Sequence, residues 1–309
     1  MKENPMTFRE FVSRFSTEEK CRDYLYGLRW ANGFVCPKCK TATKAWPIGT
    51  TLYKCSKCKH QTSVIAGTIF QDTRKPLMDW FTAIWWVTTQ KNGASAMGLQ
   101  RVLGLKSYET AWTWLHKIRA AMVHPNRTKL SGNVEVDETY IGGEETGGKR
   151  GRGTENKVLV AIAVEILEGK NQYGRVRLGV VHDAGKESLQ GFIIENVEKG
   201  STITTDGWPS YISLPQAGYT HVIEKPFDPE NEKVLPHVHM IVSLLKRWLL
   251  GTHQGAVKDE HLQAYLDEYV FRFNRRKSAS RGLLFYRLLE NAMCVEPKTL
   301  DSIRGKVAF

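Results

Sequence analysis

The stretch that decides the fold reads Val134-Glu-Val-Asp137-Glu-Thr-Tyr140, a short strand pattern that ends in acidic residues. In the residues after it, the spacing of apolar side chains alternates between that of a strand and that of a helix. The next stretch, KVLVAIAVEIL, is almost wholly apolar, and the one after it, GRVRLGVVH, alternates. The elements predicted beyond the first strand are, in chain order, strands at 157–167 and 174–182, a helix at 186–197, a strand at 201–205, and helices at 237–250 and 259–275.

Three strands, a helix and a fourth strand are the order of a ribonuclease-H-like fold, in which the first and fourth strands lie side by side. Asp137 ends the first strand and Asp206 follows the fourth, so this fold would bring the two together. With a third ligand from the following helix, such a cluster holds two divalent cations about 3.5–4 Å apart. Carboxylates suit Mg²⁺ because it prefers oxygen ligands. The plainer alternative is that Asp137 ends a strand and Asp206 begins an Asp-Gly turn.

Length and composition fit a globular protein of two or three domains, with 309 residues, 41% hydrophobic and 25% charged. No apolar run reaches the roughly 20 residues that a membrane span needs, and MKENPMTFREF at the N-terminus lacks the apolar core of a signal peptide. We therefore expect a protein outside the membrane that is not exported.

The positive charge is uneven along the chain. Residues 1–130 carry 21 Lys and Arg against 8 Asp and Glu, whereas residues 131–309 carry 23 against 24. The N-terminal part thus holds the whole excess behind the net charge of +12. This asymmetry favours a nucleic-acid-binding part joined to a second domain, although a solvated basic surface would have the same composition.

Four of the six cysteines have the spacing of a zinc site. Cys36-Pro-Lys-Cys39 and Cys55-Ser-Lys-Cys58 are separated by 15 residues, and two such turns complete a tetrahedron of thiolates around Zn²⁺. A site with four cysteines is closed, so the metal is structural. Free thiols would be the alternative, which this spacing disfavours. Cys21 and Cys294 have no partner by spacing and are predicted to be buried small hydrophobes.

Residues 93–122 predict two short helices joined by a turn at Gly104-Leu105. The apolar face of the first helix comprises Ala94, Met97, Leu99, Val102 and Leu103. Ser107 is a good N-cap for the second helix. The arrangement fits a helix-turn-helix that reads DNA, and two packed core helices would look similar. The predicted DNA contacts are Lys106, Tyr108, Lys117 and Arg119. The aromatic run around Trp80 and Trp85 is predicted to be core.

Four motifs occur in order in the second half of the chain: Val136-Asp137-Glu-Thr-Tyr-Ile-Gly-Gly143, Thr205-Asp206-Gly-Trp-x-x-Tyr211, Ser243-Leu-Leu-Lys246-Arg and Tyr265-Leu-Asp-Glu-Tyr-x-Phe-Arg-Phe-Asn-Arg-Arg276. They resemble the ISXO-like (Merlin-related) insertion-sequence transposases of the DDE superfamily. The zinc ribbon and the helix-turn-helix resemble the N-terminal part of that family, so the resemblance covers residues ~20–290.

The resemblance implies a metal-dependent DNA transposase that nicks the ends of its element and joins the freed 3′-OH to target DNA. The first two catalytic aspartates of the family fall on Asp137 and Asp206. Its third position is often a Glu, seven residues before a Lys, and counting back from Lys246 reaches His239. The resemblance therefore implies His239 as a ligand of the catalytic Mg²⁺ or Mn²⁺, and Lys246 as a contact to DNA phosphate.

A histidine at the third position has a chemical consequence. Imidazole is softer than carboxylate, so the site should favour Mn²⁺ over Mg²⁺ more than an all-acid site does. His237, Glu230 and Glu232 remain competing candidates for the third ligand, and His239 could instead be an ordinary helix histidine. Glu138 points to the other face if the strand continues past Asp137.

The implied partners are double-stranded DNA, both as terminal inverted repeats and as target, and further copies of the chain in a dimer or larger assembly. The basic loop 142–156 is either a DNA-gripping hairpin, through Lys149, Arg150 and Arg152, or a disordered insertion. Arg275 and Arg276 are predicted to contact phosphates, and Asn274 to orient a catalytic group. The expected location is the bacterial cytoplasm, at the nucleoid.

The predicted architecture is an α+β multidomain chain. Its parts are an N-terminal helical segment (1–34), a zinc ribbon (35–70), a helix-turn-helix region (71–125), a ribonuclease-H-like α/β catalytic domain (131–290) and a C-terminal tail (291–309). Two rival functions remain. One is a non-catalytic DNA-binding regulator, and the other is a structure-selective nuclease of the same fold.

Overall fold

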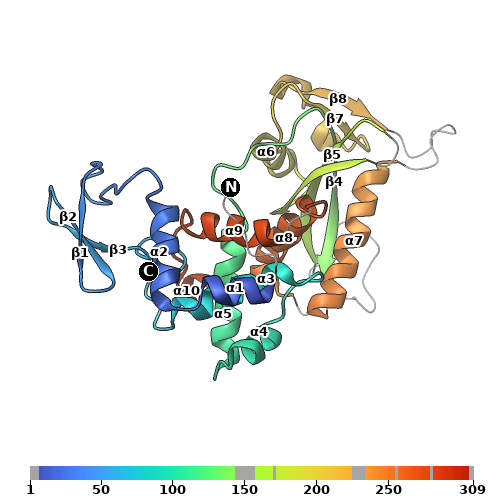
Figure 1. Cartoon of the computed structure of the whole chain (residues 1–309). Helices are drawn as coiled ribbons and strands as arrows, with labels where there is room; N and C mark the ends of the chain where they lie inside the picture. The colour runs from blue at the N-terminus through green and yellow to red at the C-terminus, as the bar shows by residue number, and fades with distance from the viewer. Residues whose placement is uncertain are drawn as a thin grey trace. The chain divides into compact units, whose positions relative to one another are not determined.

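The computed structural model describes residues 7–142, 157–169, 172–224, 234–254, 257–278 and 281–305 (Figure 1). The chain forms two compact units. Unit 1 comprises Met1–Pro125 together with Ser278–Phe309, and unit 2 comprises Asn126–Lys277. In the described part of the chain, no helix has the length and apolarity to cross a membrane.

Unit 1 is helical apart from one small sheet. Its helices are α1 (Phe8–Arg14), α2 (Glu18–Arg29), α3 (Leu77–Thr89), α4 (Ala96–Leu103), α5 (Tyr108–Ala121), α9 (Arg281–Ala292) and α10 (Leu300–Ile303). Its strands are β1 (Ala45–Ile48), β2 (Leu52–Cys55) and β3 (Gln61–Ser63), which form an antiparallel sheet in that order. The helical N-terminal segment and the strands around the cysteines agree with the prediction.

Aromatic rings form the core of unit 1. Phe285 of α9 packs against Phe11, Phe15, Phe81 and Trp85, with ring centroids 5.5–5.9 Å apart. All five side chains are buried, which confirms that the aromatic run of α3 is core. Because α9 supplies a central ring of this cluster, residues 278–309 belong with the N-terminal unit. The predicted catalytic domain extended to residue 290, whereas the structure places residues 278–290 in unit 1.

The pair α4 and α5 occurs where two helices joined by a turn were predicted. Gly104 ends α4 at a φ of +60°, a conformation that glycine adopts without strain, and Ser107 is the N-cap residue of α5. The predicted apolar face of α4 was wrong in part. Met97 and Val102 are 54% and 48% exposed, whereas Leu99 is fully buried.

Unit 2 is built on a five-stranded mixed sheet. Its strands are β4 (Asn133–Gly142), β5 (Lys157–Ile166), β6 (Tyr173–Val181), β7 (Thr202–Thr205) and β8 (Thr220–Ile223). Its helices are α6 (Lys186–Asn196), α7 (Pro236–His253) and α8 (Asp259–Asn274), with short 3-10 turns η1 (Pro209–Tyr211) and η2 (Pro215–Ala217). The order in the sheet is β6-β5-β4-β7-β8.

The predicted neighbourhood of the first and fourth strands is confirmed. β5 is antiparallel to both β4 and β6, while β7 is parallel to both β4 and β8. One detail differs from the prediction, because Asp137 lies inside β4 and does not end it. β5 pairs with β4 as far as Gly142 and so keeps the strand extended. The sequence did not predict β8, a four-residue edge strand.

Helices cover both faces of the sheet (Figure 1). On one face, α7 and α8 pack on the strands through a cluster that includes Ile162, Ile241 and Leu266. On the other, α6 and η1 pack through Val136, Ile193 and Tyr211. β4 contributes side chains to both clusters because alternate residues of a strand face opposite sides.

Side chains of α8 and of the residues after it close the β6 edge of the sheet. The Asn274 carboxamide accepts from the backbone N–H of Val176 and donates to its carbonyl, at 2.8 and 3.1 Å. Gln263 accepts from Val180 N–H at 2.9 Å, and Arg276 donates to the carbonyl of Tyr173 at 2.6 Å. An edge strand whose backbone groups are occupied resists further pairing. Asn274 is thus tied to the edge of the sheet, not to a catalytic group.

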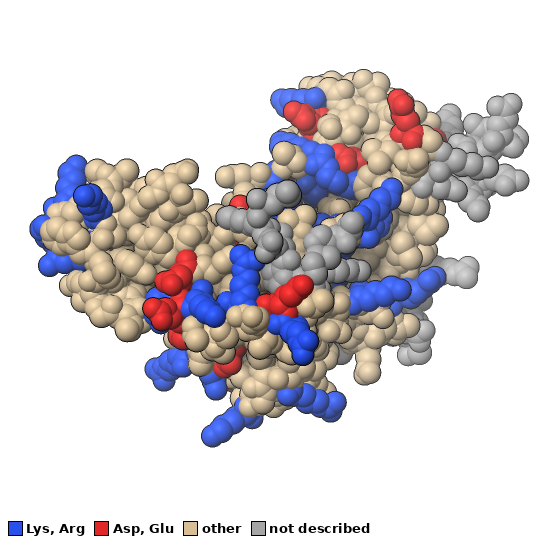
Figure 2. All heavy atoms as spheres, viewed as in Figure 1, with Lys and Arg blue, Asp and Glu red and all other residues tan. Residues whose placement is uncertain are grey.

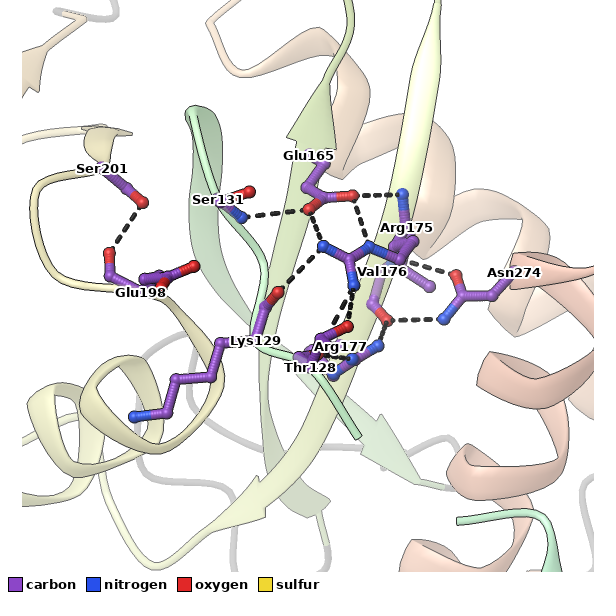
Figure 3. Close-up of polar contacts among 10 residues, drawn as sticks. All are labelled: Thr128, Lys129, Ser131, Glu165, Arg175, Val176, Arg177, Glu198, Ser201 and Asn274. Atoms are coloured by element: carbon purple, nitrogen blue, oxygen red, sulfur yellow. Dashed lines mark hydrogen bonds and ion pairs between the residues drawn. The ribbon is translucent and has the colours of Figure 1, made fainter. Parts of the chain in front are cut away.

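The segment that leads into β4 is fixed by a buried carboxylate (Figure 3). Glu165 of β5 is 7% exposed and accepts from Ser131 N–H and from the backbone and guanidinium of Arg175. Arg175 in turn donates to the carbonyls of Thr128 and Lys129. Burial disfavours the Glu165 anion, but these donors outweigh it and hold the pKa of Glu165 below its usual range.

Replacing Arg175 by Met should therefore destabilise unit 2 by about 2 kcal/mol at pH 7, because the buried carboxylate would lose both guanidinium donors and keep only two backbone N–H donors. A depressed pKa contributes stability above its unfolded value, about 4.3, and that contribution is lost as the pH falls through the folded value. The difference between R175M and the wild type, measured by urea unfolding, should shrink below about pH 4. A difference independent of pH would contradict this account.

Candidate functional site

The four predicted zinc ligands come together in unit 1. Among the residues that the structure describes, Cys36, Cys39, Cys55 and Cys58 form the only group of potential ligands whose donor atoms all lie within 4.8 Å of one another. The Sγ atoms of Cys36 and Cys58 are 3.6 Å apart, and those of Cys39 and Cys55 are 3.9 Å apart. Zn–S bonds of about 2.3 Å give tetrahedral edges of about 3.8 Å, so the cluster fits Zn²⁺.

The two Cys-x-x-Cys turns have the same backbone geometry. Lys40 and Lys59 each follow the second cysteine, with φ of 54° and 62°. Their N–H groups donate to the carbonyls of Cys36 and Cys55 at 2.9 and 3.0 Å. The turn thus directs both thiols of each pair to one side, and leaves the lysines exposed at the surface.

The pairing of β4 with β7 brings Asp137 beside Asp206. The parallel register runs from Asn133↔Thr202 to Glu135↔Thr204, and two more residues along each chain lead to Asp137 and Asp206. The two carboxylates are close enough to interact electrostatically. Burial raises the pKa of Asp137 to about 6, and the carboxylates of Glu138 and Asp206 add to the rise.

His239 is the residue of α7 that meets this pair. Its Nε2 lies 3.5 Å from Oδ2 of Asp137, and its side chain is 62% exposed. The competing candidate His237 is engaged elsewhere, because its Nδ1 lies 2.5 Å from Oε1 of Glu135. Glu230 and Glu232, which also competed for the third ligand position, lie outside the described residues.

A turn built from the second motif holds Asp206. Asp206 Oδ1 accepts from Trp208 N–H at 3.0 Å, and the Trp208 indole donates to the carbonyl of Ala184 at 3.0 Å. Gly207 has φ +85°, and a Cβ there would lie 2.7 Å from Ile223. The turn therefore requires glycine between Asp206 and Trp208.

Glu138 connects the first motif to the second on the opposite face of the sheet from Asp137. Its Oε2 accepts from the Tyr211 hydroxyl at 2.8 Å. Burial and this carboxylate raise the pKa of Tyr211, so the phenol keeps its proton and remains a donor. The expectation that Glu138 points away from Asp137 is therefore met, since β4 continues.

Two carboxylates and an imidazole, one carboxylate with a raised pKa, form a donor set that suits a divalent cation. Their ligand atoms do not all lie within 4.8 Å of one another, so this group is more open than the cysteine cluster. Lys246, two turns beyond His239 on α7, is exposed and lines a hollow with Lys157, Thr139 and Ile141. Thr139 and Ile141 follow Asp137 on the same face of β4.

The predicted DNA contacts have different environments. Lys106 and Tyr108 are exposed, and burial lowers the pKa of half-buried Lys117. Arg119 is only 2% exposed, so it belongs to the interior of unit 1 and not to a DNA-contacting surface. In Figure 2, basic side chains gather on the zinc-ribbon strands and around α4.

The remaining basic candidates lie in unit 2. Arg275 is half-buried over the Phe271 ring, and Arg276 is exposed but bonded to the β6 edge. The residues Lys149, Arg150 and Arg152 lie outside the described part of the chain. Cys21 is buried as expected, whereas Cys294 is exposed, which corrects the prediction for that residue.

Sequence reasoning assigned no role to Glu135, and none of its own to Glu138 or Tyr211. Glu135 is 5% exposed in the central strand. A signal was present, since an acid at an alternate position of an otherwise apolar strand must find donors inside the fold. The identity of those donors, on α7, depends on tertiary structure.

Comparisons with known proteins agree with these motifs. Residues 129–274 match the ISXO2-like transposase domain, and residues 16–61 match the transposase zinc-ribbon domain. A curated relative from Halobacterium salinarum, described as an uncharacterized protein in transposable element ISH50, is 27% identical over 286 residues, covering 84% of this chain and 92% of its own.

A solved structure, the cryoEM structure of a simian T-cell lymphotropic virus intasome in complex with PP2A regulatory subunit B56 gamma, aligns with a TM-score of 0.30 and 14% identity. The alignment covers 56% of this chain and 63% of that chain, and a likeness this weak supports no inference. Given the two domain matches, the chain therefore carries a transposase zinc-ribbon domain and an ISXO2-like transposase domain.

The cysteine cluster predicts one zinc ion per chain. Cys39→Ser should lower the zinc content measured by elemental analysis and unfold the ribbon, because a structural site supplies folding free energy to the segment around it. Cys294→Ser changes an exposed thiol outside the cluster and should leave zinc content unchanged. Equal zinc in all three proteins would refute the assignment.

The raised pKa of Asp137 predicts that its charge destabilises the metal-free protein. The folded pKa of about 6 exceeds the unfolded value of about 3.9, so ionisation costs stability above pH 6 and nothing below about pH 4. Asp137→Asn should stabilise the protein by about 2 kcal/mol at pH 7.5 in chelator, and not at pH 4.

Thermal unfolding at both pH values tests this expectation, with Glu195→Gln, an exposed acid on α6, as the control. Added Mg²⁺ should reduce the difference in stability between D137N and the wild type, because it stabilises the wild type alone. A gain for D137N that is the same at pH 4 and pH 7.5 would count against a buried charge at this position.

Proposed function

We propose that the chain is an active DNA transposase, with unit 2 as a ribonuclease-H-like catalytic domain. The observation that carries the proposal is the meeting of Asp137 of β4, Asp206 after β7 and His239 of α7 at one end of the central strand pair. The sheet order, with the first strand central and the fourth parallel to it, is the order that this fold requires.

In the proposed reaction a water molecule first cleaves the phosphodiester at each element end, and the freed 3′-OH then attacks a phosphodiester of the target. Bound at this site, two divalent cations would activate the attacking oxygen and stabilise the leaving one. Asp137, Asp206 and His239 would hold them. Lys246 would bind a phosphate of the DNA from the same helix, and so orient the strand at the site.

DNA recognition is assigned to unit 1. Exposed lysines border the zinc ribbon, and Lys106 and Tyr108 are exposed at the turn before α5 and at its start. We propose that these elements bind the terminal inverted repeats, α4 and α5 acting as a helix-turn-helix, with Lys117 in a supporting contact. Joining two element ends requires at least two copies of the chain, so the working form is a dimer or larger assembly on DNA. We place that assembly at the bacterial nucleoid.

A strand-transfer assay tests the proposal. Pre-nicked element ends, plasmid target and Mn²⁺ or Mg²⁺ are combined with wild type, D137A and H239A. We expect joined products with the wild type and at least a 100-fold loss in both variants, since each removes a cation ligand. Met240→Ala, a neighbouring exposed change on α7, should retain joining.

The same assay distinguishes the two rival functions. Specific binding of the ends without joining in either metal would favour a regulator. Cleavage that follows DNA shape, without joining, would favour a structure-selective nuclease. Joining that survives in H239A would keep the enzyme but remove His239 from the site. In this assay H239E should also shift activity from Mn²⁺ toward Mg²⁺, and an unchanged ratio would argue against imidazole ligation.

A further inference from the structure

The start of helix α7 is unusual because its cap comes from the central strand of the sheet. Leu235, which precedes the helix, has a left-handed backbone with φ 46° and provides no side-chain cap. Glu135 of β4 takes that role from 102 residues away. Its Oε2 accepts from the backbone N–H groups of His237 and Val238, at 2.9 and 3.0 Å. These are first-turn donors, which have no partner inside a helix.

The second carboxylate oxygen of Glu135 also contacts α7, through the side chain of His237. Oε1 accepts from Nδ1 of His237 at 2.5 Å, and the His237 ring packs edge-on against Tyr173 with centroids 5.1 Å apart. Glu135 is 5% exposed, and a carboxylate so buried is stable only with donors on both oxygens. The same three donors therefore stabilise the charge and fix the first turn of α7 on β4.

This contact between Glu135 and α7 lies next to a candidate catalytic residue on each of the two elements. Asp137 is two residues beyond Glu135 on the same face of β4, and His239 is two residues beyond His237 on α7. We propose that Glu135 is a positioning residue, which fixes where His239 lies relative to Asp137 and thereby sets the geometry of the cation site. This inference rests on the proposed function, in which Asp137 and His239 share a divalent cation.

The rest of α7 does not depend on Glu135. Ile241, Leu245 and Leu249 are buried against the sheet and α8, and hydrophobic burial of this extent holds the helix body in place. Loss of the cap should therefore release the first turn, where His239 lies, while the helix remains docked. The expected effect is on cation affinity and not on folding alone.

Direct Mn²⁺ binding is the informative measurement. Free Mn²⁺ is followed by electron paramagnetic resonance with zinc-loaded full-length protein and no DNA. Glu135→Leu removes all three acceptor contacts at similar volume and should weaken Mn²⁺ binding about 10-fold or more, the usual range for outer-shell changes. Glu135→Gln should stay within about 3-fold, because its amide oxygen can accept from both backbone N–H groups and its NH₂ can donate to the other tautomer of His237.

Glu165→Leu is the matched control. Glu165 is also a buried glutamate of the sheet, but its donors belong to Ser131 and Arg175, not to α7. E165L should destabilise the protein and leave Mn²⁺ affinity unchanged. If E135L proves too unstable, Glu135→Asp keeps the charge one methylene short of α7 and should also weaken Mn²⁺ binding.

A double-mutant cycle separates the positioning role of Glu135 from the assignment of His239 to the cation site. In an H239A background, E135L should cause little further loss of Mn²⁺ affinity, because Glu135 acts through His239. If H239A alone leaves Mn²⁺ binding intact, the proposed cation site is wrong. If H239A weakens binding but neither E135L nor E135D does, or if their losses add fully to that of H239A, the positioning role is refuted while the site stands.

Discussion

The parallel pairing of β4 with β7 is the contact on which the candidate catalytic site depends. Only three residue pairs form this ladder, yet they determine that Asp137 and Asp206, 69 positions apart in the sequence, reach the same end of the sheet. β5 holds β4 extended on one side, and β8 holds β7 on the other. The sheet thus acts as a rigid frame for two carboxylates that repel each other.

Three acidic residues of β4 illustrate how surroundings decide the role of a side chain. Glu135 is saturated by donors from α7, and Glu138 accepts from the Tyr211 hydroxyl. Between them, Asp137 has the exposed imidazole of His239 and a second carboxylate as neighbours, and its pKa rises to about 6. The outer two acids organise the scaffold, while the middle one is the residue that we propose as a cation ligand.

The sequence was most informative where function depends on local spacing or element order. Two Cys-x-x-Cys turns specify their own geometry, and short apolar or alternating stretches indicated four of the five strands of unit 2. The motif around Asp206 could be recognised, but not why Gly207 must be glycine, because Ile223 closes on it from another strand. Prediction failed where burial depends on neighbours distant in the chain, as for Arg119, Met97 and the partner of Glu135. β8 was missed because four residues carry too weak a pattern.

Unit 1 is formed by two separate stretches of sequence, and the second one follows unit 2 in the chain. Its aromatic core is completed by Phe285, which is translated only after the whole of unit 2. A chain cut short after the sheet domain would lack that ring, and unit 1 would have a hole at the centre of its packing. A frameshift or premature stop before α9 therefore disrupts unit 1, even where unit 2 is complete. In the proposed function, such a chain would keep the sheet domain but lack the stable unit that binds the element ends.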